Sequence, residues 1–321
     1  MPSSNELRTQ YTAAQEDWVW FDLSQRTQVE LTGADRAAFL HNICTNDIKG
    51  LATNRKCEAY LCNVRGKILA SIAVCALPAA LWIDAAPGLG PKIVEHLDRY
   101  LVTEDVAIAD RTQAWSHLLF VGPKAASSMR SPLERSHVRT MEHAGAAGVE
   151  YRDDWLGLPT SHLLCPRDSG VVPALDAGRQ AGTECYELLR IEAGVPEYGQ
   201  DVDESNYPQE VNRVEKTVSF TKGCYLGQEP IVMIRDRGQV QRLLVGLRLE
   251  GGAPAPVQAK ILRDSSEIGR ITSSAVSPRL GSLALGYVRR GSQEPGTKLM
   301  VEVASAVFAE AVVTAAPWAG T

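Results

Sequence analysis

The sequence predicts an α+β protein whose C-terminal part is a small β-barrel. Segments with helical periodicity and segments with strand alternation follow one another too irregularly for a doubly wound parallel sheet. After Gly238 the pattern changes to short strand-like runs separated by turn residues, which is typical of a closed barrel. The expected barrel strands are residues 242–250, 257–263, 267–275, 282–289, 298–303 and 306–314. We find no candidate catalytic residue among them, so we expect this barrel to pack against the rest of the chain.

The preceding residues combine amphipathic helices with antiparallel strands. A helix is expected over residues 34–43, ending before Thr45-Asn46-Asp47, whose side chains suit a turn or a cap. A strand pair is expected over residues 56–77, with Gly66 at the position where a hairpin needs it. The other expected strands are residues 18–23, 29–31, 106–109 and 115–121, the other helices are 91–100 and 184–192, and residues 131–148 are expected to be irregular or weakly stranded.

Composition excludes several classes of protein. The chain has 321 residues, of which 45% are apolar, so it can bury a substantial core. A net charge of −5 argues against a broad surface for nucleic acid or for anionic membranes. No stretch approaches the roughly 18 apolar residues that span a bilayer, and the polar start lacks the features of a signal peptide. These observations predict a cytoplasmic protein with no nucleic-acid or membrane partner.

The cysteines do not form a recognisable framework. There are seven of them, an odd number, so reduced thiols are the simplest expectation. Cys44, Cys57, Cys62 and Cys75 lie close in sequence, but the chain contains no Cys-x-x-Cys pair. Cys57 and Cys62 are also separated by an odd number of positions on one expected strand, so their side chains point to opposite faces. We therefore expect buried thiols and no metal site.

One segment concentrates more potential chemistry than any other, Lys222-Gly223-Cys224-Tyr225-Leu226-Gly227-Gln228-Glu229, here called the octet. Its glycines allow a tight turn around Cys224. Lys222 lies two residues from the thiol, and a nearby ammonium favours the nucleophilic thiolate. Pro230 suits the first turn of a helix through residues 231–234, which would place Gln228 and Glu229 at the positive end of that helix. The plain alternative is a turn that carries a small buried hydrophobe.

The octet resembles the signature Lys-Gly-Cys-(Phe/Tyr)-x-Gly-Gln-Glu of the YgfZ family, folate-binding proteins of iron–sulfur cluster assembly or repair. The match is complete at every fixed position. Arg190-Ile191-Glu192-Ala193-Gly194-Val195-Pro196, Tyr198-Gly199, Thr45-Asn46-Asp47 and the C-terminal strands resemble elements that YgfZ shares with the aminomethyltransferase GcvT. The resemblance implies a folate-binding module of two interleaved subdomains over residues 1–237 and a β-barrel domain over residues 238–321.

The resemblance also implies where tetrahydrofolate, or a folate derivative, would bind. Asn46 or Asp47 would face the folate cavity, and Arg65 would attract the glutamate tail. His162 stands at the approximate position of the glutamate that grips the pterin ring in aminomethyltransferases. The remaining implied folate contacts are Arg190, Tyr198, Gln228 and Glu229. Each of these assignments has a plain alternative. The Thr45-Asn46-Asp47 segment could be only a turn, Arg65 only a solvated cation, and His162 only a structural histidine.

One departure from the aminomethyltransferases bears on activity. They carry an aspartate after the hairpin glycine, whereas this chain reads Gly66-Lys67-Ile68-Leu69-Ala70-Ser71. We therefore expect a folate-binding protein that assists iron–sulfur client enzymes or assembly proteins, with Cys224 and Lys222 as its reactive pair. The alternative is a folate-dependent aminomethyltransferase or demethylase. Whether the chain is an enzyme stays open at this point.

Overall fold

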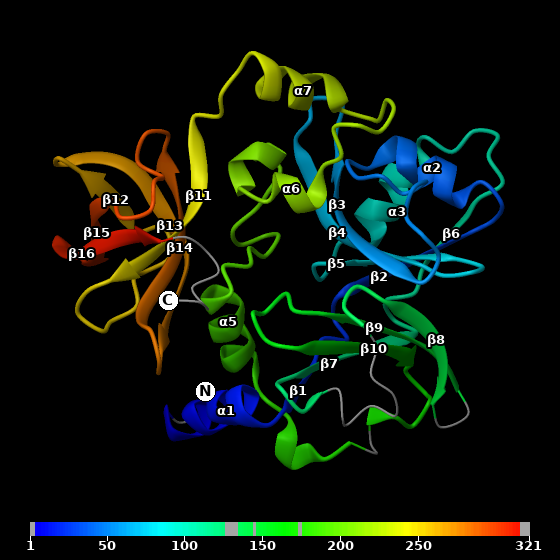
Figure 1. Cartoon of the computed structure of the whole chain (residues 1–321), viewed down its shortest axis with the longest axis horizontal. Coiled ribbons are helices and arrows are strands. Elements are labelled where there is room, and N and C mark those ends of the chain that lie inside the picture. Colours follow the sequence, from blue (N-terminus) through cyan, green and yellow to red (C-terminus); the bar gives the residue numbers. More distant parts are fainter. Residues whose placement is uncertain (1–3, 126–133, 144–145, 173–174, 315–321) are drawn as a thin grey trace.

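The computed structural model describes residues 4–125, 134–143, 146–172 and 175–314. Two five-stranded sheets and a closed six-stranded barrel surround the middle of the molecule (Figure 1). The expected α+β architecture with a C-terminal barrel is confirmed. The positions of the three units matter for function, because a large cavity lies between them.

The first sheet holds the predicted hairpin. Its strand order is β3-β4-β5-β2-β6, and helices α2 and α3 pack against its core. The elements are β2 (Thr27–Thr32), α2 (Arg36–Ile43), β3 (Arg55–Cys62), β4 (Ile68–Ala76), β5 (Leu81–Ala85), α3 (Gly90–Asp98) and β6 (Ala107–Asp110). Leu31, Leu40, Leu61 and Ile83 are completely buried between the sheet and the helices. The predicted helices over residues 34–43 and 91–100 are thus present, with slightly different ends.

The second sheet is built from segments that precede and follow the first sheet in the sequence. Its order is β1-β7-β10-β9-β8, so the chain makes β1, then the whole first sheet, and then returns. The strands are β1 (Val19–Asp22), β7 (Trp115–Val121), β8 (Val138–His143), β9 (Ala146–Asp153) and β10 (Thr160–Pro166). For residues 131–148 we expected irregular or weakly stranded structure. In the described part the stranded alternative is the correct one, because β8 and β9 pair in a regular antiparallel register. That pairing depends on partners that local sequence pattern does not reveal.

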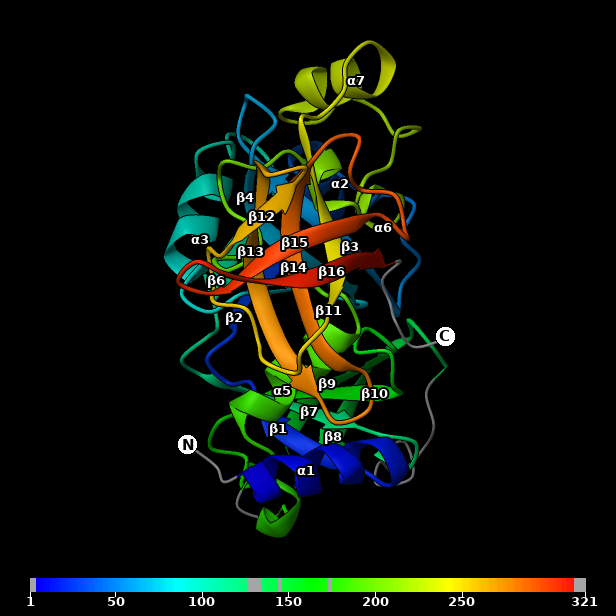
Figure 2. The ribbon, with the colours of Figure 1, turned by 90° about the vertical axis from the view of Figure 1, so that its left-hand side faces the viewer.

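Two helices pack beside this second sheet. The polar N-terminal segment, for which we expected no element, forms α1 (Ser4–Glu16). Its buried residues Tyr11 and Ala14 pack with β1 and with α5 (Thr183–Glu192). The Tyr11 hydroxyl donates a hydrogen bond to Glu192 at 3.0 Å. Tertiary packing, rather than periodicity, therefore fixes α1 (Figure 2).

The barrel closes in the order β11-β14-β13-β12-β15-β16, and all six predicted strands are present. They are β11 (Arg242–Leu249), β12 (Lys260–Arg263), β13 (Ser266–Ser277), β14 (Gly281–Arg289), β15 (Lys298–Ala304) and β16 (Val307–Thr314). Fully buried Leu247, Ile261 and Ile271 belong to its core. The predicted domain boundary at residue 238 stays a prediction.

A long connection joins α5 to the barrel and delivers the octet. It contains η3 (Pro208–Val211), α6 (Val214–Thr217) and α7 (Gln228–Asp236), and the short η2 (Ala177–Arg179) precedes α5. Figures 1 and 2 both show α7 at one end of the molecule and α1 at the other. Among the described residues, no helix is long and apolar enough to cross a membrane.

Candidate functional site

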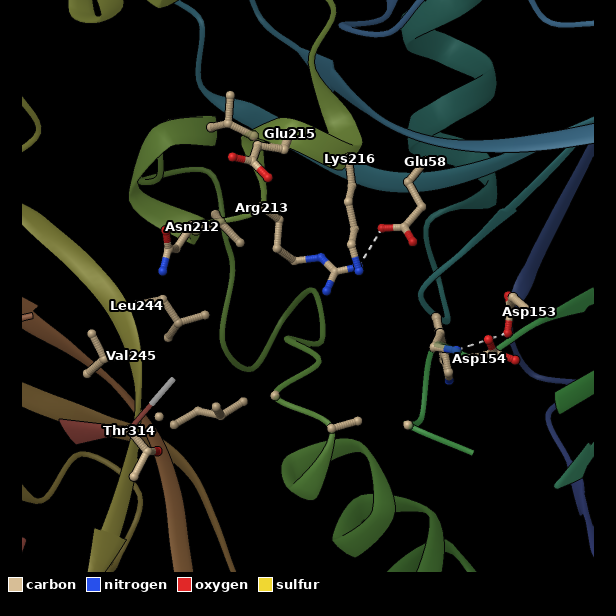
Figure 3. Close-up of a pocket in the computed structure, with 18 of the residues that line it drawn as sticks. Glu58, Asp153, Asp154, Asn212, Arg213, Glu215, Lys216, Leu244, Val245 and Thr314 are labelled. Atoms are coloured by element: carbon tan, nitrogen blue, oxygen red, sulfur yellow. Dashed lines mark hydrogen bonds and ion pairs between the residues drawn. The ribbon is translucent and has the colours of Figure 1, made fainter. Parts of the chain in front are cut away.

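A cavity of about 1210 Å³ opens where the two sheets, the connection and the barrel meet (Figure 3). Its wall combines Lys56 and Glu58 of β3, Trp155 of the β9–β10 loop, Arg213 of the connection and Leu244 of β11. A smaller cavity of about 70 Å³ shares four of these wall residues and extends toward β4 and β5. We call the two together the central cavity. Every structural unit contributes to it, so its shape depends on the complete fold.

Several of the charged side chains on the wall are paired. Arg213 contacts Glu58 at 2.6 Å, Arg26 contacts Asp84 at 2.6 Å, and Lys56 is bound to Asp153. Burial alone would raise the pKa of a carboxyl group. The adjacent Lys56 ammonium nevertheless holds the pKa of Asp153 well below its usual range.

The same holds for Asp84, whose pKa lies far below its usual range because Arg26 outweighs the effect of burial. Strongly paired carboxylates of this kind are weak bases. Glu197 differs, because burial raises its pKa although Arg26 Nη1 lies 3.2 Å from Glu197 Oε1. Much of the charge on the wall is therefore neutralised within ion pairs.

The structure shows which residues after the hairpin glycine Gly66 face the central cavity. Ser71 of β4 lines the smaller part of the central cavity, whereas the neighbouring Ala70 is 1% exposed and belongs to the core of the first sheet. Successive side chains on a strand point to opposite faces, so Ser71 lies on the face of β4 that is turned to the cavity. The cavity wall thus carries a hydroxyl at this place.

The octet lies against the β3–β4 hairpin, and its glycines make that contact possible. Gly227 has φ of 77° and precedes α7, while Gly66 in the hairpin has φ of 71°. A methyl group on Gly227 would collide with the Asn63 carbonyl, and one on Gly66 would come within 3.1 Å of the Gly227 carbonyl. Leu226 also donates its backbone N–H to the Asn42 carbonyl at 2.9 Å. The predicted helix after Gly227 is confirmed as α7.

Lys222 binds the end of α2. Its Nζ donates to the carbonyl of Cys44 at 2.8 Å, to that of Asn46 at 2.7 Å and to that of His41. The ammonium also lies 4.8 Å from the centre of the Tyr225 ring. These carbonyls close the C-terminal end of a helix, where a cation is favourable. Lys222 therefore joins the octet to the Thr45-Asn46-Asp47 turn, and its predicted effect on the thiol stays a prediction.

Cys224 differs from the other six cysteines, all of which lie in described parts of the chain, because it alone is exposed. Burial raises the pKa of Cys44 to about 11 and that of Cys57 to about 12, so those thiols are unreactive at neutral pH. Cys224 is not among the residues that line the central cavity. Within the described residues, no group of three or more His, Cys, Asp or Glu side chains is arranged to hold a metal ion.

The other predicted folate contacts lie at varied distances from the cavity wall. Tyr198 lines the smaller part of the cavity, and its hydroxyl accepts a hydrogen bond from Lys92 at 3.1 Å. The Asn46 amide donates to the backbone carbonyls of Glu58 and Lys216, at 2.8 and 3.0 Å, and so supports the wall from behind. Asp47 instead lies 3.1 Å from His41, at the end of α2.

Four further predicted residues have no part in the lining of the central cavity. Arg65 is exposed in the hairpin, while Gln228 and Glu229 begin α7. Arg190 is fully buried, where it binds Asp201 at 2.8 Å and also contacts Glu187 and Ser273. Arg190 thus joins α5, the connection and the barrel. Roles for these residues in folate binding stay predictions.

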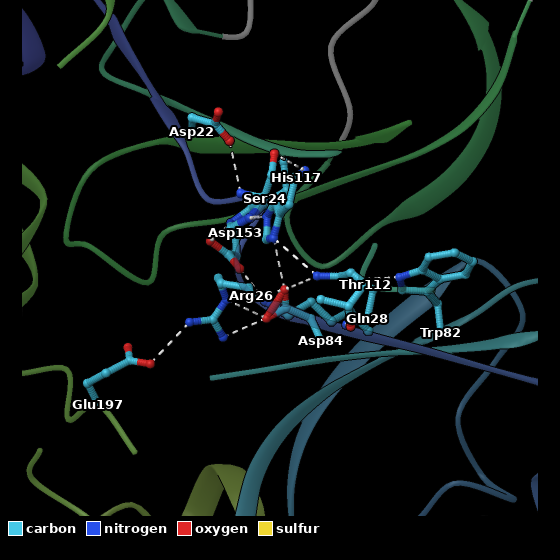
Figure 4. A network of polar contacts seen from close by, with 12 residues as sticks. Asp22, Ser24, Arg26, Gln28, Trp82, Asp84, Thr112, His117, Asp153 and Glu197 are labelled. Carbon is cyan, nitrogen blue, oxygen red and sulfur yellow. Dashed lines mark hydrogen bonds and ion pairs between the residues drawn. The ribbon is translucent and has the colours of Figure 1, made fainter. Parts of the chain in front are cut away.

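His162 lies inside the protein, 2% exposed, where it stacks on Tyr151 at 4.2 Å. It belongs to a buried polar network that includes His117, Asp84 and Asp153 (Figure 4). Our sequence reasoning missed the other three residues. The available signal was a charged or titratable side chain inside an apolar strand, as in Leu81-Trp82-Ile83-Asp84-Ala85.

Comparison with known proteins agrees with this architecture. Residues 3–148 match the model of the GCVT N-terminal domain, and residues 242–319 match that of the glycine cleavage T-protein C-terminal barrel domain. A probable aminomethyltransferase of Natronomonas pharaonis is 28% identical over 98% of this chain and 91% of its own length. An aminomethyltransferase of Herpetosiphon aurantiacus is also 28% identical, over 91% of this chain and 84% of its own.

Among solved structures, the glycine cleavage system aminomethyltransferase T of Bartonella henselae superposes with a TM-score of 0.88. It is 20% identical, and the match covers 97% of this chain and 89% of that one. This likeness shows a shared fold. The two family matches together cover well over half of the sequence and include both ends of the fold. The chain belongs to the glycine cleavage T-protein, or GcvT, family.

Proposed function

We propose that this protein binds tetrahydrofolate, or a folate derivative, in the central cavity and acts in the assembly or repair of iron–sulfur clusters, with Cys224 as its reactive thiol. The observation that carries the proposal is the complete octet, whose cysteine is the exposed one of seven. A free cysteine is usually buried and inert, whereas an exposed one can meet a partner. The partners would be iron–sulfur client enzymes or assembly proteins.

Membership of the GcvT family supports folate as the ligand. A cavity of about 1210 Å³ has room for a bicyclic ring and its tail, and ligand pockets commonly measure about 300–1,000 Å³. The Trp155 indole N–H is buried on this wall without a protein acceptor, although the described residues satisfy most of their polar groups. A heterocycle with acceptor atoms would satisfy it.

A second candidate function is aminomethyl transfer, which the names of the relatives favour. The wall of the cavity argues against it, because β4 presents the Ser71 hydroxyl to the cavity and no carboxylate, and the nearby Asp84 is held by Arg26. Losing a general base typically lowers a rate ~10²–10⁴-fold. We therefore expect little turnover with an aminomethylated carrier protein and tetrahydrofolate. Turnover comparable to that of an authentic T-protein would reverse this ranking.

Deletion of the gene tests the main proposal. Enzymes that depend on iron–sulfur clusters should lose activity, while matched cluster-free enzymes keep theirs. Complementation with Cys224→Ser should fail, and complementation with Cys165→Ser, a buried cysteine away from the octet, serves as the control. Equal loss in both enzyme classes, or full rescue by Cys224→Ser, would refute the proposal.

A further inference from the structure

Two buried histidines connect two carboxylates of the central cavity. His117 of β7 and His162 of β10 are 1% and 2% exposed. His117 Nδ1 lies 2.9 Å from Asp84 Oδ2, and His117 Nε2 lies 2.9 Å from His162 Nδ1. His162 Nε2 lies 3.4 Å from Asp153 Oδ1. The four side chains thus form three polar contacts in series, and each end of the series lines the cavity.

The number of protons available decides how these contacts are made. Three hydrogen bonds in series need three protons, whereas two neutral imidazole rings carry two. The two contacts of 2.9 Å require protons, because Asp84 is an ionised acceptor held by Arg26. His117 therefore donates from Nδ1 to Asp84, and His162 donates from Nδ1 to His117.

The contact of 3.4 Å between His162 Nε2 and Asp153 Oδ1 is then the one that has no proton between its two atoms. His162 Nε2 faces Asp153 with its lone pair free. Asp153 does not need a hydrogen bond from His162, because Lys56 and the Thr160 hydroxyl both donate to it. This assignment of protons places a buried basic nitrogen directly behind a carboxylate of the cavity wall.

We propose that His162 holds one proton on behalf of the central cavity. A ligand group X–H gives its proton to the Asp153 carboxylate, and X keeps the electron pair. The proton then moves to the lone pair of His162 Nε2 and returns by the same path. No oxidant or further reactant takes part. The inference rests on the proposed function only in assuming that a ligand occupies the cavity.

The surroundings of the ring suit temporary protonation. On β9, Asp153 faces Nε2, and Tyr151 stacks on the ring at 4.2 Å, where its π face favours an imidazolium. Trp155 meets the ring edge-on at 6.1 Å. From β3, the Lys56 ammonium opposes the added charge. From β7, His117 presents Nε2 as an acceptor.

Charges beyond His117 complete this environment. Asp84 of β5 is paired with Arg26, which also lies 3.2 Å from Glu197, and Gln28 of β2 donates to Asp84 at 2.8 Å. Counting Lys56 and Asp153 as well, the network carries one net negative charge while both rings are neutral. Burial lowers the pKa of His162 to about 4, so Nε2 carries no proton at neutral pH in the ligand-free protein, and a proton that it takes from a ligand passes back readily.

Nuclear magnetic resonance of the ligand-free full chain, labelled with ¹⁵N at histidine, tests the proton count directly. At pH 7 we expect both rings to carry hydrogen on Nδ1 and none on Nε2. His117→Gln and His162→Gln identify the two signals, and His137→Gln, a half-buried histidine outside the network, should leave both unchanged. Hydrogen on His162 Nε2 at pH 7 would overturn the proposal.

A titration with and without ligand separates this inference from the proposed function. As the pH falls toward 4, His162 Nε2 should gain one proton, and the His117 signals should shift in the same step because the rings share a hydrogen bond. With saturating tetrahydrofolate, the pKa of His162 should move, since Asp153 contacts both the cavity and the ring. If tetrahydrofolate binds and the pKa of His162 does not move, the proposed role of His162 as a proton acceptor is refuted, while folate binding stands. If the tautomers are as expected and tetrahydrofolate does not bind, only the proposed ligand fails.

Discussion

Replacing Lys222 with methionine should destabilise the protein substantially, although the side-chain length is kept. The substitution leaves the carbonyl groups of His41, Cys44 and Asn46 without their common donor. A buried acceptor that loses its partner costs ~1–3 kcal/mol, and carbonyls at a helix end recover part of this from water. We therefore expect the free energy of unfolding to fall by ~2–4 kcal/mol.

Urea unfolding followed by tryptophan fluorescence measures this change. Lys216→Met is the matched control, because Lys216 is an exposed lysine of the same region whose substitution should change stability by less than ~0.5 kcal/mol. Hydrogen exchange should show the loss concentrated in α2 and the octet. Equal stability of the two variants would refute the assignment of Lys222 as the link between the octet and α2.

Three further predictions test the buried charges and the cavity wall. The pKa of His162 is lower in the folded state, about 4, than the ~6.5 of an unfolded histidine, so its contribution to stability is present above pH 6.5 and is lost as the pH falls toward 4. Urea midpoints against pH should therefore fall less steeply in His162→Gln than in the wild type, and parallel curves would contradict this. Ala70→Asp should prevent folding or lower the free energy of unfolding by several kcal/mol, because it buries an unpaired carboxylate. Ser71→Asp, on the cavity side of the same strand, should fold. Equal solubility and equal thermal stability of the two variants would contradict the assigned faces. Arg190→Met should cost ~3–5 kcal/mol in urea unfolding because it leaves Asp201 buried without its cation, while Arg99→Met, at an exposed ion pair, should cost less than ~1 kcal/mol, and similar losses would contradict the role of Arg190.

Periodicity and turn residues predicted much of the fold. The helices over residues 34–43 and 91–100, the hairpin at Gly66 and all six barrel strands depend on local pattern, and each is present. The helix α1 was not predicted, and β8 lies in a segment for which only irregular or weakly stranded structure was predicted, because both sequences are polar and their tertiary neighbours stabilise them. Local sequence therefore identified the elements that bury an obvious apolar face.

The candidate site was harder to predict. Sequence spacing placed Lys222 beside the Cys224 thiol, but the folded chain directs the ammonium to the end of α2. His162 was selected from an approximate alignment. Its partner Asp153 lies nine positions away on the neighbouring strand β9, whereas His117 lies 45 positions away on β7. Residues separated by tens of positions meet in this network, so only the three-dimensional arrangement identifies it.

Calorimetric titration with tetrahydrofolate tests the central claim most directly. The account predicts saturable binding to the wild type and to Ser266→Phe, an exposed control on the barrel. Binding should be lost in Ser71→Phe, because the larger side chain fills the smaller part of the central cavity. A wild type that gives no heat of binding at millimolar tetrahydrofolate, or a Ser71→Phe variant that binds as well as the wild type, would contradict the account.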